Sequence, residues 1–424
     1  MGVPVVCEEG KRQGRIVVHG GRCATGPHES MRASVEIIEG RITHILSDQF
    51  SLSAPCCPEI DLRGFLIMPG LINAHDHLEF ALFPRLGGSH YRNYVEWGID
   101  IHDRFDDVIA KHRSVPKDVR LWWGGIRNIL CGVTTVGHHN PLWPELQRDD
   151  FPVRVVQEYG WAHSLALGGD LRMAHSATPE GRAFIVHACE GVDEKAREEL
   201  SELDRLGVLD ESAVIVHGLA LDSKGVALMQ QRGVSLIVCP SSNYFLFGKV
   251  PDMSLLCGID NVALGSDSPL TAKGDLLDEV YFAIRFCNIS SLLAYRMVTE
   301  APAAVLRLEN GEGSIRVSGI GDLIAVRDTK HDAVDRLPAL SMRDVELVMI
   351  GGRVQLASEE MFERLAFPVK QGMEPLCVDG MVRWLRAPVR ELLQKAEKVL
   401  GTDEVRLGGK PIRIPTRVEV GYAY

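Results

Sequence analysis

The segment Met68-Pro-Gly-Leu-Ile-Asn-Ala-His75-Asp-His77-Leu-Glu79 carries the strongest signal in the chain. It is an apolar run that ends in two histidines separated by a single residue. Side chains at positions i and i+2 of an extended strand point to the same face, so both imidazoles can reach one metal ion. The segment therefore predicts a buried strand that carries part of a metal site at its carboxyl end.

Three later apolar runs end in side chains that suit the same site, namely His187, His217 and Asp267. Helical stretches, such as Asp193 to Leu206 and Ser223 to Arg232, separate these runs. Alternating strands and helices of this length predict a parallel α/β barrel or open sheet. In a parallel barrel the carboxyl ends of all strands open on one face, so the polar groups converge. Imidazoles with a carboxylate suit zinc or a similar divalent ion.

Two distant segments predict a separate β structure. Val35 to Leu46 and Val345 to Leu356 each contain two short β-branched runs joined at a glycine, and both predict β-hairpins. A small β domain built from both ends of the chain would then accompany the central α/β domain. In the last part of the chain, Asp379 to Leu400 has apolar residues at helical spacing and predicts a helix interrupted at Pro388.

Composition narrows the class of protein. The 424 residues are 46% apolar and 24% charged, which is typical of a soluble globular protein. The net charge is −11 and no Lys/Arg-rich run occurs, which argues against nucleic acid or an anionic membrane as a partner. We find no signal peptide and no long uncharged apolar stretch. The ten cysteines form no CxxC pair and predict free thiols in a reducing cytoplasm.

Together these motifs resemble the amidohydrolase superfamily, in particular its branch of cytosine and guanine deaminases and triazine hydrolases. The resemblance covers most of residues 15 to 356. The matching segments are Pro69 to Leu78, Gly132-Val-Thr-Thr-Val136, His187-Ala-Cys-Glu190, Val216-His217-Gly218, Cys239-Pro-Ser-Ser-Asn243, Gly265-Ser-Asp267, Thr299 to Leu308 and Gly321 to Val326.

The resemblance implies an α/β fold, a distorted (β/α)₈ TIM barrel with a β-sandwich formed from both chain ends. We accordingly expect a composite β-sandwich domain from residues 1–68 and 312–365. Residues 69–311 would form the barrel, and residues 366–424 a C-terminal helical extension.

The resemblance also implies the roles of the strand-end residues. Four of them would bind one divalent ion, zinc or iron(II): His75, His77, His187 and Asp267. Asp267 would accept a proton from the metal-bound water, and His217 would polarise the substrate. Glu190 would shuttle protons between water, ring nitrogen and leaving group. A metal ion lowers the pKa of its water to about 7, and a nearby carboxylate can then hold the released proton.

Substrate contacts are expected from the loops and from the second strand. The candidates are Arg85, His138, His139 and Asn243. Arg85 has a structural ion pair as its alternative role, and one histidine of the His138-His139 pair is expected to point away from the pocket.

The fourth strand and helix depart from the family pattern. No lysine ends a strand between Val153 and His187, which favours one metal, although Glu158 leaves a carboxylate bridge to a second metal open. Because the segment from Gly160 to Arg182 is short, His163 or His175 is expected to replace the substrate contact usually supplied there.

These observations predict a metal-dependent aminohydrolase that adds metal-bound hydroxide to an amino-substituted nitrogen heterocycle and releases ammonia. The basis is Glu190, since protonating a ring nitrogen and then an amine needs a movable acid beside the metal. The alternatives are hydrolysis of a cyclic or linear amide C–N bond, and a non-catalytic scaffold. The expected partner is a small-molecule substrate, with assembly into a homo-oligomer left open.

Overall fold

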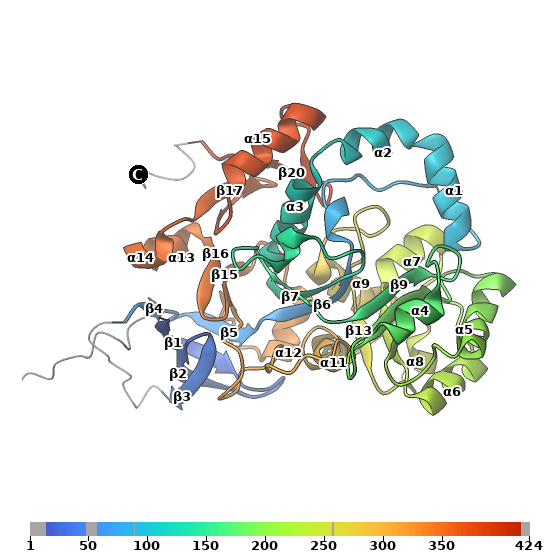
Figure 1. The fold of residues 1–424 in the computed structure, drawn as a ribbon. Helices are drawn as coiled ribbons and strands as arrows, with labels where there is room; N and C mark the ends of the chain where they lie inside the picture. The colour runs from blue at the N-terminus through green and yellow to red at the C-terminus, as the bar shows by residue number, and fades with distance from the viewer. Residues whose placement is uncertain (1–13, 48–56, 89, 257, 417–424) are drawn as a thin grey trace, which may run out of the picture.

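The structure is a computed structural model that describes residues 14–47, 57–88, 90–256 and 258–416. Figure 1 shows a region built from both ends of the chain beside a region of alternating strands and helices. Within the described residues the strands form one large sheet and two smaller parallel sheets. This agrees with the expected mixed α/β class with parallel strands.

The large sheet has 12 strands within the described residues, ordered β19-β20-β17-β18-β16-β15-β14-β5-β1-β2-β3, with β4 beside β1. It joins the two chain ends where β5 pairs antiparallel with β14. The strands are β1 (Arg15–Ala24), β2 (Ser30–Ile38), β3 (Arg41–Ser47), β4 (Glu59–Asp61), β5 (Phe65–Pro69), β14 (Leu323–Arg327), β15 (Val345–Ile350), β16 (Arg353–Ser358), β17 (Glu374–Val378), β18 (Met381–Leu385), β19 (Arg406–Leu407) and β20 (Lys410–Arg413).

Both predicted hairpins are confirmed. Strands β2 and β3 pair antiparallel around Glu39 and Gly40, and β15 and β16 pair antiparallel around Gly351 and Gly352. All four turn residues have positive φ, between 49° and 80°. Two-residue hairpin loops need such angles to match the twist of the strands, and glycine adopts them without steric cost.

The two parallel sheets follow the chain order. One has the order β6-β7-β8 and the other β9-β10-β11-β12-β13. Most residues of these strands are buried, as expected for parallel strands with both faces covered. Their bounds are β6 (Leu71–Asp76), β7 (Val133–His138), β8 (Arg154–Val155), β9 (Gly160–Ser164), β10 (Phe184–Ala188), β11 (Ala213–His217), β12 (Ser235–Val238) and β13 (Val262–Leu264).

Helices connect and cover these strands. They are α1 (Tyr94–Arg104), α2 (Asp106–Arg113), α3 (Lys117–Leu130), α4 (Leu171–Ser176), α5 (Glu194–Leu206), α6 (Ser223–Arg232), α7 (Pro240–Phe247), α8 (Met253–Leu256), α9 (Leu276–Phe286), α10 (Ser291–Arg296), α11 (Glu300–Val305), α12 (Ala333–Arg336), α13 (Glu359–Arg364), α14 (Phe367–Lys370) and α15 (Val389–Leu400). Short 3₁₀ turns are η2 (Leu78–Phe80), η3 (Pro144–Gln147) and η4 (Leu337–Ala339).

Helices α5 and α6 confirm the two helices expected between the later strands. The side chain of Asp193 caps α5 by accepting a hydrogen bond from Ala196 N, and Asp222 caps α6 in the same way. Both helices end at a glycine with left-handed φ, Gly207 and Gly233. Local capping therefore sets the length of both helices.

The C-terminal part differs from the expected helical extension. Strands β17 and β18 form an antiparallel hairpin that joins the large sheet, turning at Asp379 and Gly380, which both have positive φ. A helix through Asp379 to Leu400 is therefore wrong for its first part, and α15 begins only after Pro388. The apolar residues of β18 pack inside the protein, where Trp384 stacks on Phe362 with ring centroids 3.8 Å apart.

Seven described cysteines are free, and six of them are buried. Cys7, Cys56 and Cys257 lie outside the described residues. In the part of the chain that the structure describes, no helix is long and apolar enough to cross a lipid bilayer.

Candidate active site

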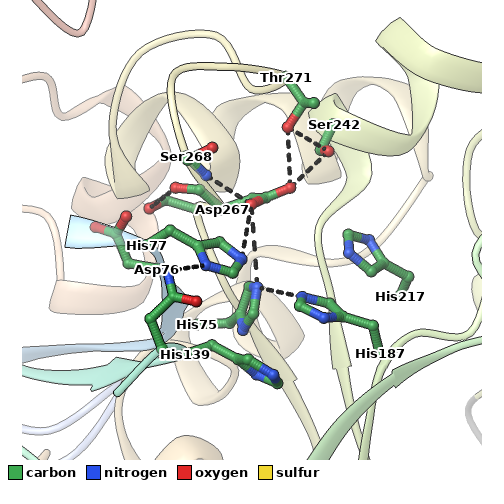
Figure 2. A network of polar contacts seen from close by, with 12 residues as sticks. His75, Asp76, His77, His139, His187, His217, Ser242, Asp267, Ser268 and Thr271 are labelled. Atoms are coloured by element: carbon green, nitrogen blue, oxygen red, sulfur yellow. Dashed lines mark hydrogen bonds and ion pairs between the residues drawn. The ribbon is translucent and has the colours of Figure 1, made fainter. Parts of the chain in front are cut away.

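The polar residues predicted at the strand ends converge in space, as Figure 2 shows. His75 Nε2 lies 3.2 Å from His187 Nε2. The Oδ1 atom of Asp267 lies 4.0 Å from His75 Nε2 and 3.8 Å from His77 Nε2. One nitrogen from each of the three histidines lies within 4.8 Å of the others, and all four residues are buried. Strands β6 and β10 and the segment after β13 thus bring these donors together.

The protonation of the histidines suits a cation. His187 Nδ1 donates to the carbonyl oxygen of His163 at 2.7 Å, so its Nε2 carries the free lone pair that faces His75. Burial lowers the pKa of His75 and of His187 well below the ordinary value, which keeps both rings neutral. Neutral imidazoles with one carboxylate are a donor set that zinc or iron(II) takes, so the residues present fit the expected metal.

Asp267 is held as an anion by its neighbours. Its Oδ2 accepts hydrogen bonds from Ser242 at 2.7 Å and Thr271 at 3.0 Å, and its Oδ1 accepts one from Ser268 N at 2.7 Å. Burial alone would raise the pKa of Asp267, but the neighbouring His217 and His77 and these hydrogen bonds lower it. Asp267 also has a positive φ of 51°, which aims its side chain from the strand end.

A second carboxyl group, Glu190, has the opposite character. Its Oε1 lies 3.6 Å from His217 Nε2. Burial, with the charges of Asp267 and Glu199, raises the pKa of Glu190 well above its ordinary value. Burial lowers the pKa of His217, whose Nδ1 donates to Asn243 Oδ1 at 2.9 Å. Burial therefore disfavours the charged form of both groups.

These groups form the floor of a cavity of about 650 Å³. The floor is lined by His77, Asn140, His163, His187, Glu190, His217 and Asp267. The wall is mostly apolar, and comes largely from η2, α1 and α2: Phe80, Phe83, Tyr94, Trp97, Ile101, Ile109 and Leu270. The cavity can thus hold a ring over the cluster while excluding water from its sides.

The predicted substrate contacts are placed differently from expectation. Arg85 is exposed, with its guanidinium 4.4 Å from the centre of the Phe245 ring, and does not line this cavity. His138 and His139 are both buried behind the cavity. Asn243 does not line the cavity either, and contacts His217 instead. The positions of these side chains depend on loop conformation and on packing. The sequence pattern of polar residues at strand ends predicts neither of them.

The two buried histidines support the cluster from behind. His138 Nδ1 accepts a hydrogen bond from Leu78 N, and its Nε2 lies 3.5 Å from Glu79 Oε2. His139 Nε2 donates to the carbonyl oxygen of Ala162 at 3.0 Å, and its ring centre is 4.2 Å from that of His187. Both rings therefore pack against the residues around the candidate ligands rather than facing a substrate.

The structure also shows where the three residues with undecided roles around the fourth strand lie. Glu158 is exposed and pairs with Arg182 at 2.7 Å, away from the histidine cluster, so it gives no support to a second metal. His163 lines the cavity, whereas His175 pairs with Asp210 at 3.0 Å and does not.

Several contributing residues lie outside the set of site residues predicted from the sequence. Ser242 lies inside the Cys239 to Asn243 motif, so that motif was the available signal for its bond to Asp267. Tyr94 and Trp97 line the cavity from α1. No motif marks Tyr94, because its place depends on how α1 lies over the strand ends.

Comparison with known proteins agrees with this arrangement. Residues 166–354 match the amidohydrolase family model. The 5-methylthioadenosine/S-adenosylhomocysteine deaminase of Natronomonas pharaonis is 28% identical over 382 residues, covering 74% of this chain and 87% of that protein. The protein of the same name from Thermococcus onnurineus is 26% identical over 417 residues, covering 82% and 95%.

Solved structures share the fold. An adenosine deaminase from Xanthomonas campestris with bound zinc has a TM-score of 0.67 at 18% identity, covering 91% of this chain and 97% of that one. Atrazine chlorohydrolase from Arthrobacter aurescens complexed with zinc has a TM-score of 0.68 at 15% identity, covering 91% and 99%. The chain thus carries an amidohydrolase family segment, residues 166–354, and is similar over most of its length to proteins named as deaminases.

Proposed function

We propose that this protein is a metal-dependent aminohydrolase that releases ammonia from an amino-substituted nitrogen heterocycle. The observation that carries the proposal is Glu190, a buried carboxyl group with a raised pKa that lies 3.6 Å from His217 on the cavity floor. Removing an amino group from an aromatic ring requires a proton donor at this place. The relatives named as deaminases support the same reaction.

The metal site of this proposal consists of His75, His77, His187 and Asp267, holding one divalent ion, zinc or iron(II). A divalent ion in such a site makes water acidic enough to serve as a nucleophile at neutral pH. Solved structures of this fold contain zinc, which supports the choice of metal.

The side chains divide the proton transfers between them. Asp267, held as a carboxylate by Ser242 and Thr271, accepts the proton released by the attacking water. Glu190 donates its proton to the ring nitrogen beside the amino-bearing carbon. It then takes the proton of the hydroxyl group added to that carbon and delivers it to the departing amine, and the proton held by Asp267 finally restores Glu190. His217, oriented by Asn243, stabilises the negative charge that builds on the substrate. His163 lies on the cavity floor, where it contacts the ring.

The side chains of the cavity wall indicate which kind of substituent the substrate ring can carry. Phe83, Ile101, Ile109 and Leu270 belong to one apolar cluster, with Trp97 packed against it. The indole N–H of Trp97 already donates to Leu86 O at 3.0 Å. This part of the wall therefore favours an apolar group on the ring, whereas His102, Asp103 and Arg113, which also line the cavity, can meet a polar group.

We also infer that the two parallel sheets form one distorted (β/α)₈ barrel. Their three and five strands in the described residues make eight, in chain order. The inner side chains of both sheets, including Ile72, Val214 and Ile237, pack in one cluster. The barrel would span residues 69–311, beside a β-sandwich from 1–68 and 312–365. Amidohydrolase neighbours of similar fold support this division.

A direct test measures ammonia released by zinc-loaded protein across a panel of aminopurines, aminopyrimidines, pterins and triazines. The proposal expects at least one aminated ring to yield ammonia and the corresponding hydroxylated ring in equal amounts. Ring opening, or a new carboxylate without ammonia, would favour the amide-hydrolase alternative. No turnover by protein with a full complement of metal would favour the non-catalytic alternative.

A further inference from the structure

A second carboxyl group, Glu199 on α5, lies directly behind Glu190. Its Oε2 accepts a hydrogen bond from the backbone N–H of Cys189 at 2.7 Å. The backbone N–H of Glu190 and the hydroxyl of Tyr94 lie beside the same carboxyl group. Glu199 does not line the cavity, so it contacts the chain that carries the acid and not the substrate.

The backbone at this point has an unfavourable conformation. Cys189 has a φ of +56°, in the left-handed region that side chains with a Cβ atom avoid. Cys189 lies between the candidate ligand His187 and the candidate acid Glu190. Its turn ends the run of β10 and directs the carboxyl group of Glu190 into the cavity, beside His217. Something must hold this turn in place for the acid to stay aligned.

The position of Glu199 on its helix points to such a role. The buried residues of α5 are Ala196, Leu200 and Leu203, one stripe at helical spacing. Glu199 is three residues after Ala196 and borders this stripe, where an apolar residue would normally pack against the barrel. A carboxyl group at this position is explained by the hydrogen bond that it accepts from the backbone N–H of Cys189. The neighbouring Glu198 is exposed and lacks these contacts.

The other side of the same turn is tied to α1. Tyr94 N donates to the carbonyl oxygen of Glu190 at 3.2 Å, and Val192 N donates to the carbonyl oxygen of Arg92 at 2.7 Å. Asn93 Nδ2 donates to Asp193 Oδ2 at 2.7 Å. The loop that carries Glu190 is thus held between α1 on one side and α5 on the other. Glu199 is the side chain of α5 that contacts this loop.

We propose that Glu199 is a positioning residue, which holds the left-handed turn at Cys189 and so aligns the carboxyl group of Glu190 with the substrate ring. This inference rests on the proposed function, because Glu199 acts only through Glu190. It predicts that loss of Glu199 impairs proton transfer while leaving substrate affinity and metal binding in place.

The first experiment compares Glu199→Ala with the matched control Glu198→Ala on the same helix. We expect Glu199→Ala to lower kcat by about 10- to 100-fold, the range for residues that orient a catalytic group, with KM and zinc content within about twofold of wild type. Glu198→Ala should leave kcat within about twofold. Equal kcat values for the two variants, or a loss confined to KM, would overturn the proposal.

The second experiment tests the turn itself. In the Glu199→Ala background, Cys189→Gly should recover kcat several-fold, because glycine adopts the left-handed conformation without a clamp. Cys189→Ala removes the same thiol but keeps the Cβ atom, so it should give no recovery. If Cys189→Gly and Cys189→Ala changed kcat equally, the proposal that Glu199 acts by holding the left-handed turn would be wrong. Should Glu199→Ala fail to fold, Glu199→Gln, which has one acceptor oxygen fewer, serves as the background for the same comparison.

A third measurement does not depend on any substrate. Hydrogen exchange of the backbone amides of Cys189 and Glu190, followed by mass spectrometry of zinc-loaded protein, should be faster in Glu199→Ala than in Glu198→Ala. If the exchange rates of the two variants were the same, the proposal that Glu199 holds the turn at Cys189 would be wrong, even in an active enzyme. If no substrate in the panel releases ammonia but exchange is still faster in Glu199→Ala, the role of Glu199 in holding the turn is supported and the proposed function is wrong.

Discussion

The Nε2 atom of His217 lies 3.6 Å from the Oε1 atom of Glu190, where the neighbouring parallel strands β11 and β10 end. Burial raises the pKa of the carboxyl group and lowers that of the imidazole, which favours the form of the pair with the proton on Glu190. A cavity that stores one proton on a carboxyl group beside a neutral ring is suited to donate it to a substrate nitrogen.

Glu190→Gln should lower kcat by about 10²- to 10⁴-fold, the usual contribution of general acid–base catalysis. Glutamine keeps the size and hydrogen bonding of the side chain but cannot give and regain a proton. KM and metal content should change little. Steady-state ammonia release checks the result, and near-normal turnover on the true substrate would remove Glu190 from the mechanism.

His217→Asn should keep the bound metal and lower kcat by about 10²- to 10³-fold, as loss of one electrostatic contact to a reacting group commonly does. Asn243→Ala, which leaves the His217 ring in place but removes its partner at 2.9 Å, should have a smaller effect. Metal analysis and kcat are measured on the same samples. Metal loss together with activity loss in His217→Asn would make His217 a ligand.

One divalent ion per chain is expected, and dialysis against a chelator should remove both the ion and the activity. The chain should stay folded, because the candidate ligands lie at strand ends above a large apolar core. Elemental analysis and circular dichroism provide the two readouts. His75→Ala should bind less than a tenth of the wild-type metal under the same conditions, and two ions per chain in the wild type would contradict the single site.

Ser242→Ala should weaken metal binding or kcat/KM by about 10-fold or more, since partners that orient a ligand contribute in this range. The hydroxyl of Ser242 donates to Asp267 Oδ2 at 2.7 Å and stabilises the carboxylate form. Its loss raises the pKa of Asp267, so the acid limb of the pH profile of kcat/KM should move to higher pH. An unshifted limb would show that Thr271 alone is sufficient.

The stability of the fold should depend on pH through Glu279 on α9. This buried carboxyl group accepts a hydrogen bond from Ser241 N at 2.7 Å, and burial raises its pKa to about 8. Since its folded pKa exceeds the ordinary value of 4.5, its stabilising contribution is full below pH 4.5 and is lost as the pH rises through 8.

The test replaces Glu279 with glutamine, which keeps the acceptor oxygen and cannot ionise. The free energy of unfolding of Glu279→Gln relative to wild type should therefore increase between pH 5 and pH 9 in urea denaturation. A difference that stays constant with pH would mean that Glu279 titrates near its ordinary value.

The class of the fold followed from patterns that act locally. Buried parallel strands need continuous apolar runs, and hairpins need residues such as Gly40 and Gly351 that accept positive φ, so both are visible in the sequence. Polar residues at strand ends, such as His75 and His187, converge because parallel strands share one open face. Their role as metal ligands remains a prediction.

Tertiary structure alone decided which side chains face the cavity. Arg85 packs on Phe245, and His138 and His139 are buried behind the cavity, because the loops and strands that carry them are placed by distant packing. The direction of Glu190 depends on one left-handed residue, Cys189, whose partner Glu199 lies on the next helix. Such long-range contacts leave no periodic signal, which is why strands and strand ends were predictable and the cavity wall was not.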